Sequence, residues 1–206
     1  MKKLFLTLIF ICLTSLHAQA IMPGLLQIWG SGSTAAVKTL DDTYNESNNN
    51  SNDNMWLCNN EPSAYQSFTS GGGTLDSAKV WLKKLSTPTG TLNALIYAHT
   101  GLYGTSSKPT GAALATSDNF DLSTPTTSYA EVEFTFSGAE RISLSSINYI
   151  LAITLTGGST TCSSVMGIVA SDTSEPGHDG NGGWYTGGDW VAKIGHDLVF
   201  YLYVYR

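Results

Sequence analysis

Alternation of apolar and polar residues is the dominant pattern from residue 64 to the end of the chain. In five segments every second residue is apolar, which is typical of a strand that buries one face. The segments are Ser77–Leu85, Thr91–His99, Ala130–Phe136, Asn148–Leu155 and Asp197–Tyr205. A sixth segment, 163–170, is more uniformly apolar. The alternation predicts these inward positions: Ala78, Val80, Leu82, Leu92, Ala94, Ile96, Ala98, Val132, Phe134, Phe136, Tyr149, Leu151, Ile153, Leu155, Leu198, Phe200, Leu202 and Val204.

Glycine and proline clusters separate the predicted strands. Pro88-Thr89-Gly90 and Pro109-Thr110-Gly111 fit turns in which proline sets the first angle and glycine accepts a positive φ. Gly71–Gly73 and Gly157-Gly158 have the same turn chemistry. No helical period of useful length occurs between them. Strands joined by turns without helices predict an all-β fold, a single antiparallel β-sandwich of jelly-roll type.

Residues 1–63 differ from the rest of the chain. Residues 1–20 have the features of a secretory signal peptide: Lys2 and Lys3, a short apolar run, and the cleavage-type sequence Ala18-Gln19-Ala20. We therefore expect a secreted protein, and no later run approaches the ~18 apolar residues of a membrane span. Residues 21–63 are interpreted as an N-terminal strand plus an Asn/Ser-rich loop. The loop is assigned to Asp41–Asn54, which has too few apolar residues to offset the entropy of ordering.

Charge and cysteine content limit the classes of partner. The formal net charge is -6. Removal of Lys2 and Lys3 would leave eight basic residues against sixteen acidic ones. Such a chain has no basic patch for nucleic acid, because that binding depends on releasing counterions from phosphates. Cys58 and Cys162 would be the cysteines of the exported chain, and they are a candidate disulfide.

Several segments together are similar to a known family. They are "YQSFT", "GGGTLDSAKVWLKKLSTPTGTLNALIYA", "KPTGAALATSDNFDLS", "TSYAEVEFTFS", "NYILAITLTGG" and "GHDLVFYLYVY". In this order they resemble the choice-of-anchor R-type β-sandwich domains of secreted bacterial and phage structural proteins. The resemblance covers about residues 64–206. It implies a non-catalytic jelly-roll module, similar to carbohydrate-binding modules, that serves attachment or display.

The stretch "GNGGWYTGGDW", residues 180–190, is the main candidate for a ligand site. Its Gly187-Gly188 pair predicts a β-hairpin turn, and the hairpin would bring its two tryptophans near each other. Flat aromatic faces beside polar groups recognise sugars, but aromatic residues also stabilise sheets and subunit contacts. Both interpretations stay open. The candidate ligand-binding residues are Trp184, Tyr185, Asp189 and Trp190, with Trp81 and Tyr97 expected to point away from the core.

Metal and catalytic interpretations have weaker motifs. Asp179 and Asn181 could bind calcium, which prefers carboxylate and amide oxygens, and no other cofactor is expected. The neighbouring His178 and the pair His196-Asp197 also suggest a metal cluster or a His–Asp pair, but the spacing fits no zinc arrangement. No GxSxG nucleophile elbow occurs.

Three functions follow from these observations. The first is a non-catalytic secreted binding or attachment module whose partner is a glycan or a cell-surface protein. The second is a structural or assembly protein, such as a virion surface component or a self-assembling extracellular protein. Its homo-oligomer contacts would use the Tyr201–Tyr205 face and the Ile21–Trp29 segment. The third is a small secreted hydrolase without a recognised motif.

Overall fold

The protein is an antiparallel β-sandwich. The computed structural model describes residues 35–55, 62–85, 87–157, 167–174 and 177–206, and Val37–Arg206 forms one compact unit. The predicted signal peptide, the Ile21–Trp29 segment, Cys58 and Cys162 lie outside the described residues. In the described part, the two helical elements are 3-10 turns, η1 (Glu46–Asn48) and η2 (Gly138–Glu140), and no helix is long and apolar enough to cross a membrane.

The first layer, here the β4 sheet, is built around the longest strand. Its strands are β1 (Lys38–Tyr44), β2 (Ser51–Met55), β4 (Gly73–Lys84), β8 (Ala130–Thr135), β9 (Ser143–Leu144), β11 (Gly167–Asp172), β14 (Asp197–Leu198) and β15 (Phe200–Tyr205). They follow the order β1-β15-β4-β11-β14, while β8 and β9 pair with β4 and β2 pairs with β11.

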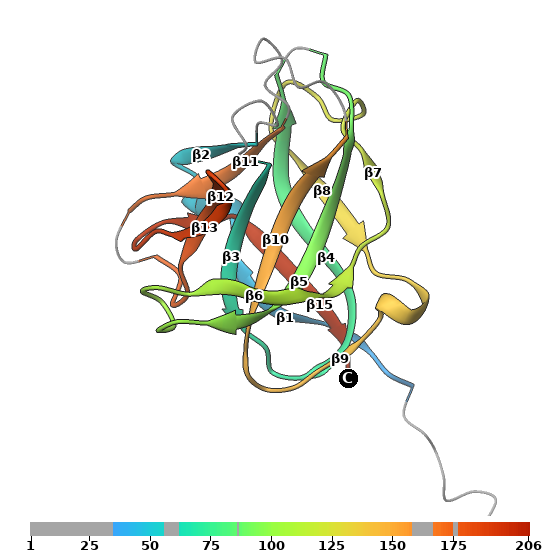
Figure 1. Cartoon of the computed structure of the whole chain (residues 1–206). Helices are drawn as coiled ribbons and strands as arrows, with labels where there is room; N and C mark the ends of the chain where they lie inside the picture. Colours follow the sequence, from blue (N-terminus) through green and yellow to red (C-terminus); the bar gives the residue numbers. More distant parts are fainter. Residues whose placement is uncertain (1–34, 56–61, 86, 158–166, 175–176) are drawn as a thin grey trace, which may run out of the picture. The chain divides into compact units, whose positions relative to one another are not determined.

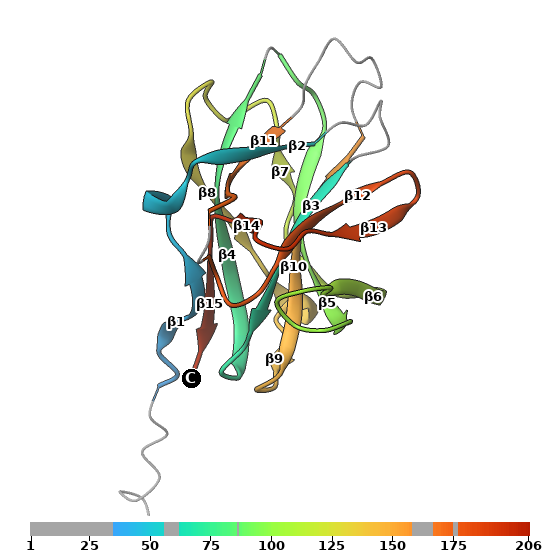
Figure 2. The same cartoon turned by 90° about the vertical axis from the view of Figure 1, so that its left-hand side faces the viewer.

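The second layer, here the β10 sheet, lies against it. Its strands are β3 (Ser63–Thr69), β5 (Thr91–Thr100), β6 (Lys108–Thr116), β7 (Phe120–Asp121), β10 (Asn148–Thr156), β12 (Gly182–Thr186) and β13 (Asp189–Ala192). The order is β13-β12-β3-β10-β5-β6, and β7 pairs with β5. Figures 1 and 2 show β3, β10 and β5 as one layer, and β4, β8 and β15 as the other. The predicted all-β sandwich is confirmed, whereas its jelly-roll detail stays a prediction.

The space between the layers holds the main core. Every inward position that the alternation predicts is buried except Ala98, which is half-buried. Phe68 of β3 links the two sheets, because its ring stacks on Tyr149 of β10 at 5.9 Å and approaches Phe200 of β15 at 6.5 Å. Period-two alternation therefore located the main core correctly.

A second, smaller core lies on the outer face of the β10 sheet. There Tyr65, Ile150 and Ala152 are buried, and Tyr97 and Trp190 pack against them; these five residues are here called the outer cluster. The sheet curls far enough that its edge strands β6 and β13 come into contact. Strand β10 is consequently covered on both faces, which fits its nearly continuous apolar run better than one-sided burial does.

The interpretation of Asp41–Asn54 as a loop is wrong. These residues form most of β1, the η1 turn and most of β2, and the compact unit begins at Val37. Strand β1 pairs with β15, and β2 pairs with β11. Between them the Asn45 side chain accepts a hydrogen bond from the Ser47 N–H at 3.0 Å. Backbone pairing with apolar partner strands orders this segment, so its own shortage of apolar residues did not decide its structure.

One predicted turn is also corrected. Pro109-Thr110-Gly111 lies inside strand β6, where Gly111 has a φ of 71°. The pairing of β5 with β6 shifts register between Ile96 and Ala98, so the glycine serves a β-bulge rather than a chain reversal. The predicted turns at Gly71–Gly73 and Pro88–Gly90 do connect β3 to β4 and β4 to β5.

Candidate ligand-binding site

The stretch 180–190 forms the predicted hairpin. Strands β12 and β13 are joined by Gly187 and Gly188, with Thr186 paired to Asp189. The two glycines have φ values of 61° and 97°. Positive φ at both central residues belongs to the mirror-image turns that match strand twist, and glycine adopts it without steric cost.

The two tryptophans of the hairpin lie on opposite faces, so their expected proximity is wrong. Trp190 pairs with Tyr185, whereas Trp184 pairs with Val191. Residues directly opposite each other share a face of the sheet, and successive residues along a strand alternate between the two faces. Trp184 is one position out of register with Trp190, so the two indoles lie on opposite faces. Trp190 belongs to the outer cluster, where its ring meets Tyr65 at 5.5 Å and Tyr97 at 5.9 Å.

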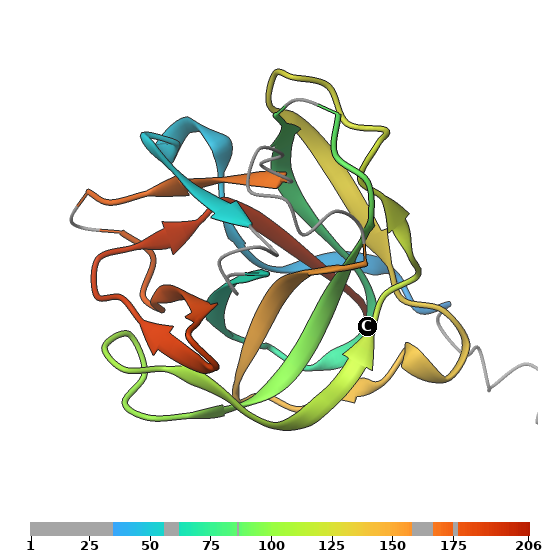
Figure 3. The same ribbon diagram turned by 45° about the horizontal axis from the view of Figure 1, so that its top comes forward.

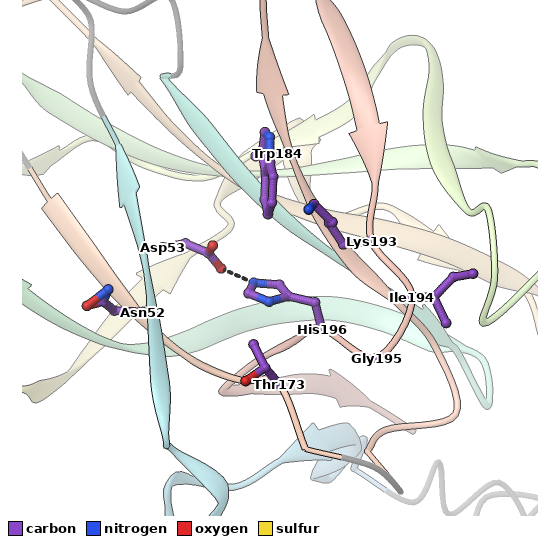
Figure 4. A pocket seen from close by; sticks show the side chains of 8 residues that line it. All are labelled: Asn52, Asp53, Thr173, Trp184, Lys193, Ile194, Gly195 and His196. Atoms are coloured by element: carbon purple, nitrogen blue, oxygen red, sulfur yellow. Dashed lines mark hydrogen bonds and ion pairs between the residues drawn. The ribbon is translucent and has the colours of Figure 1, made fainter.

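Trp184 points into the space between the sheets. It pairs with Ala64 of β3, a residue of the main core, and therefore shares the inner face of the β10 sheet. At this edge of the sandwich the hairpin lies on the same side as β2 and β11 (Figure 3). The inter-sheet space opens here into a pocket of about 440 Å³. The residues that line it are Asn52, Asp53, Thr173, Trp184, Lys193, Ile194, Gly195 and His196 (Figure 4).

A buried pair joins the two sides of the pocket. His196 Nε2 lies 2.6 Å from Asp53 Oδ2, and both residues are buried. Because the carboxylate accepts, the imidazole proton is on Nε2. Along β2, Asp53 and Met55 are buried and face inward, whereas the alternating residues Asn52 and Asn54 are exposed. The pair thus fixes β2 to the chain that enters β14, and little of either side chain is exposed to a ligand.

The electrostatic effect of Asp53 extends to a neighbouring phenol. Burial first, and then the charge of Asp53, raise the pKa of Tyr129 to about 12.

The turn between β13 and β14 supplies the rim. The Lys193 N–H donates to the Gly182 carbonyl at 3.0 Å, and the Gly182 N–H donates to the His196 carbonyl. These two backbone hydrogen bonds position the side chains of Lys193 and His196 next to Trp184. The imidazole of His196 meets the indole at 5.7 Å and 89°, and Lys193 Nζ lies 4.6 Å from the indole centroid. Ile194, which is 69% exposed, extends the apolar surface outward.

Three of the glycines in this region permit close approach rather than a turn. A Cβ on Gly183 would lie 2.2 Å from the Val191 carbonyl oxygen and 2.6 Å from the Tyr65 ring. A Cβ on Gly182 would lie 2.5 Å from the His196 carbonyl oxygen, and one on Gly180 would lie 2.0 Å from that of Ser67. Side chains at these positions would push the hairpin and the rim of the pocket away from β3.

The structure separates the six predicted ligand-binding residues. Trp184 lines the pocket. Tyr97 and Trp190 belong to the outer cluster, and Tyr185 packs on Trp190 at 5.1 Å. Trp81 is half-buried on the outer face of the β4 sheet, and Asp189 is exposed and accepts from the Trp190 N–H at 2.7 Å.

Most of the pocket was missed from the sequence. The residues not predicted as ligand contacts are Asn52, Asp53, Thr173, Lys193, Ile194, Gly195 and His196. The sequence draws attention to His196 because of its neighbour Asp197, but its partner is Asp53, 143 residues away. No local pattern signals that pairing.

The calcium candidates are placed differently from each other. Asp179 is exposed, whereas Asn181 is fully buried. The Asn181 amide oxygen accepts from the Ser107 N–H at 3.1 Å, and its nitrogen donates to the Ser107 and Gly182 carbonyls. The described residues contain no group of three His, Cys, Asp or Glu side chains suited to a metal ion. The Asn181 side chain therefore has a structural role, and calcium binding at this position stays an untested prediction.

His178 and Asp197 belong to a separate buried network. His178 Nδ1 accepts from Gln66 Nε2 at 3.2 Å and from the Gly180 N–H at 3.0 Å, so the proton on Nε2 is donated to Asp42 at 3.1 Å. Asp197 accepts from Gln66 at 2.8 Å and from the His178 N–H at 2.9 Å. Burial raises the pKa of Asp197 despite these bonds. The network attaches the loop before β12 to β3 and β14.

A serine–histidine contact occurs elsewhere in the protein. His99 Nε2 lies 3.0 Å from Ser107 Oγ. Ser107 has no exposed surface, so its hydroxyl cannot reach a substrate in this conformation. The contact gives no support to the hydrolase interpretation.

The chain matches no protein-family model and no curated protein. The resemblance to choice-of-anchor R-type domains is therefore supported only by the all-β sandwich it implies.

Proposed function

We propose that the protein is a secreted, non-catalytic binding module that takes a glycan in the pocket at the open edge of its sandwich. The half-exposed Trp184 indole in a pocket lined by hydrogen-bonding side chains is the observation that carries the proposal. Sugars combine apolar ring faces with polar edges, and small-molecule sites commonly pair apolar surface with a few placed polar groups. Thr173 and Lys193 are exposed and supply the polar edge.

The carboxylates support binding rather than glycoside hydrolysis. Hydrolysis generally uses two carboxyl groups across the scissile bond. Among the described residues that line the pocket, Asp53 is the one carboxylate, and it is buried against His196. Glu131 and Glu133, which alternate along β8, lie on the outer face of the β4 sheet and form ion pairs with Lys79 at 2.7 Å and Lys38 at 3.1 Å.

The alternative function, a structural protein that assembles through its Tyr201–Tyr205 face, receives less support from the outer face of the β4 sheet. Lys38 and Lys79 place their ammonium groups over the Tyr203 ring at 5.0 Å and 5.6 Å. Both lysines also pair with the glutamates of β8. Interface cores are depleted of charged residues, so this paired, charged surface favours contact with water over contact with another subunit.

Replacing each hairpin tryptophan tests the proposal. Trp184→Ala should abolish binding on a glycan array and change stability little, because the indole is half-exposed at the pocket. Trp190→Ala should lower the free energy of unfolding by about 2 kcal/mol, because it removes a ring that packs against those of Tyr65, Tyr97 and Tyr185. It should retain glycan binding in conditions where the variant stays folded. Array binding and urea unfolding measure the two effects.

Two results would overturn the proposal. The first is failure of the unchanged protein to bind any glycan on the array. The second is glycan binding that survives in folded Trp184→Ala at the original affinity, because the site would then lie elsewhere.

A further inference from the structure

Among the described residues that line the pocket, one exposed side chain is charged, and that charge is positive. Among the lining residues only Asp53, His196 and Lys193 are ionisable, and the first two are buried against each other. Lys193 is exposed at the rim. This cation stands out on a chain with a formal net charge of -6.

Lys193 has an aromatic contact but no acceptor among the described residues. Lys38 reaches Asp76 at 2.7 Å, and Lys79 reaches Glu131 at 2.7 Å. In the part of the chain that the structure describes, no carboxylate or carbonyl oxygen accepts a hydrogen bond from Lys193 Nζ, which lies over the Trp184 ring at 4.6 Å. Within the described residues, its three donors are thus free for a ligand.

We infer that the ligand is an acidic glycan, with a carboxylate or sulfate on the sugar residue that stacks on Trp184. This inference rests on the proposed function. The ammonium group of Lys193 covers part of one face of the Trp184 indole (Figure 4). A neutral sugar stacking there replaces the cation–π contact with hydrogen bonds from the ammonium group to uncharged hydroxyl oxygens. An acidic sugar places an anionic oxygen at the same position, and a hydrogen bond between two charged groups is stronger than one to an uncharged acceptor.

The test compares matched probes in which one kind of anionic group, carboxylate or sulfate, is either kept or removed. One arm uses oligogalacturonate and its methyl ester, hyaluronan oligosaccharides and their methyl esters; the other uses chondroitin sulfate oligosaccharides before and after desulfation. The variants are Lys193→Gln and Lys83→Gln. Lys83 is a matched control, because its Nζ also lies over an aromatic ring, that of Tyr129 at 4.3 Å, but it does not line the pocket.

The expected result is tighter binding of the charged member of at least one pair. Lys193→Gln should weaken that binding by about tenfold, as expected for one charge-assisted hydrogen bond, and Lys83→Gln should leave it unchanged. Affinity for the charged probe should also fall as salt is added, because the site is exposed. The arm that responds identifies the anionic group as carboxylate or sulfate.

The remaining outcomes separate this inference from the proposed function. Binding that depends on Trp184 but is equal for charged and neutral probes overturns the acidic ligand and leaves a neutral glycan site. An equal loss in Lys193→Gln and Lys83→Gln also overturns it, because general charge would then explain the effect. If no glycan of any kind binds, both proposals fail.

Discussion

At the scale of single residues, the glycines of 180–190 have two distinct roles. Gly187 and Gly188 have positive φ, and a Cβ added at either position would meet nothing within 4 Å. Gly182 and Gly183 instead allow backbone and rings to come close. The first role is conformational and the second is steric, so substitutions at the two kinds of position should differ in cost.

Two alanine substitutions distinguish these roles. Gly183→Ala should lower the free energy of unfolding by about 3 kcal/mol, because its Cβ would overlap the Val191 carbonyl and the Tyr65 ring. Gly187→Ala should cost about 1 kcal/mol, because only the positive φ opposes it. Urea unfolding measures both. Equal losses would contradict the steric role of Gly183.

At the scale of elements, Asp172 at the end of β11 connects segments that are distant in sequence. Its carboxylate accepts from Tyr44 of β1, from Asn50 before β2, and from the Ser174 N–H at 2.8 Å. Burial works to raise the pKa of Asp172, but hydrogen bonds from Tyr44, Ser174 and Asn50 outweigh it and hold the pKa below its ordinary value. The carboxylate thereby holds the polar β1–β2 segment against the sandwich.

The stability that Asp172 contributes should depend on pH. A pKa lowered by folding gives stability that is present above the unfolded value, about 3.9, and is lost as pH falls through the lower folded value. Asp172→Asn should be less stable than the unchanged protein by about 2 kcal/mol at neutral pH. The difference should shrink below about pH 4.

Urea unfolding at several pH values checks this expectation. Asp179→Asn serves as the control, because Asp179 is exposed and should contribute little. A difference between Asp172→Asn and the unchanged protein that stays constant down to acid pH would contradict the role of the ionised carboxylate.

At the scale of the compact unit, two cores share one strand. Tyr149, Leu151 and Ile153 of β10 face the main core, while Ile150 and Ala152 face the outer cluster. Strand β10 also has hydrogen-bonded neighbours on both edges, β3 and β5. Strand β13 is short and forms an edge of the same sheet.

Amide hydrogen exchange should reflect this difference. The β10 amides should exchange slowest, because only extensive unfolding exposes them, and the outward amides of β13 should exchange much faster. Residue-resolved exchange measured by NMR makes the comparison. Equal protection of β13 and β10 would contradict this expectation, because β13 pairs with only one strand, β12, among the described residues.

How much of the structure could be predicted depended on where each signal lies. Alternation such as that of Val132 and Phe134 can be recognised within a single strand's own sequence. Most of the strands and the main core were therefore predictable. The β1 and β2 strands were missed because they are ordered by pairing with β15 and β11, which are distant from them in the sequence. The hairpin was predictable from Gly187-Gly188. The faces of its tryptophans were not, because they depend on the exact pairing of β12 with β13, in which Trp190 lies opposite Tyr185 and not opposite Trp184. The Asp53–His196 pair could not be predicted, because its two residues are 143 positions apart and only the fold brings them together.

The location of the pocket at an edge has a consequence for how its selectivity can change. Asn52, Thr173, Lys193 and Ile194 are all exposed, and none belongs to either core. Substitutions at exposed positions usually change stability by about 0.5 kcal/mol or less. These four positions can therefore be randomised as a recognition library on a constant scaffold, with Trp184 and the Asp53–His196 pair retained, to obtain variants that discriminate among different ligands.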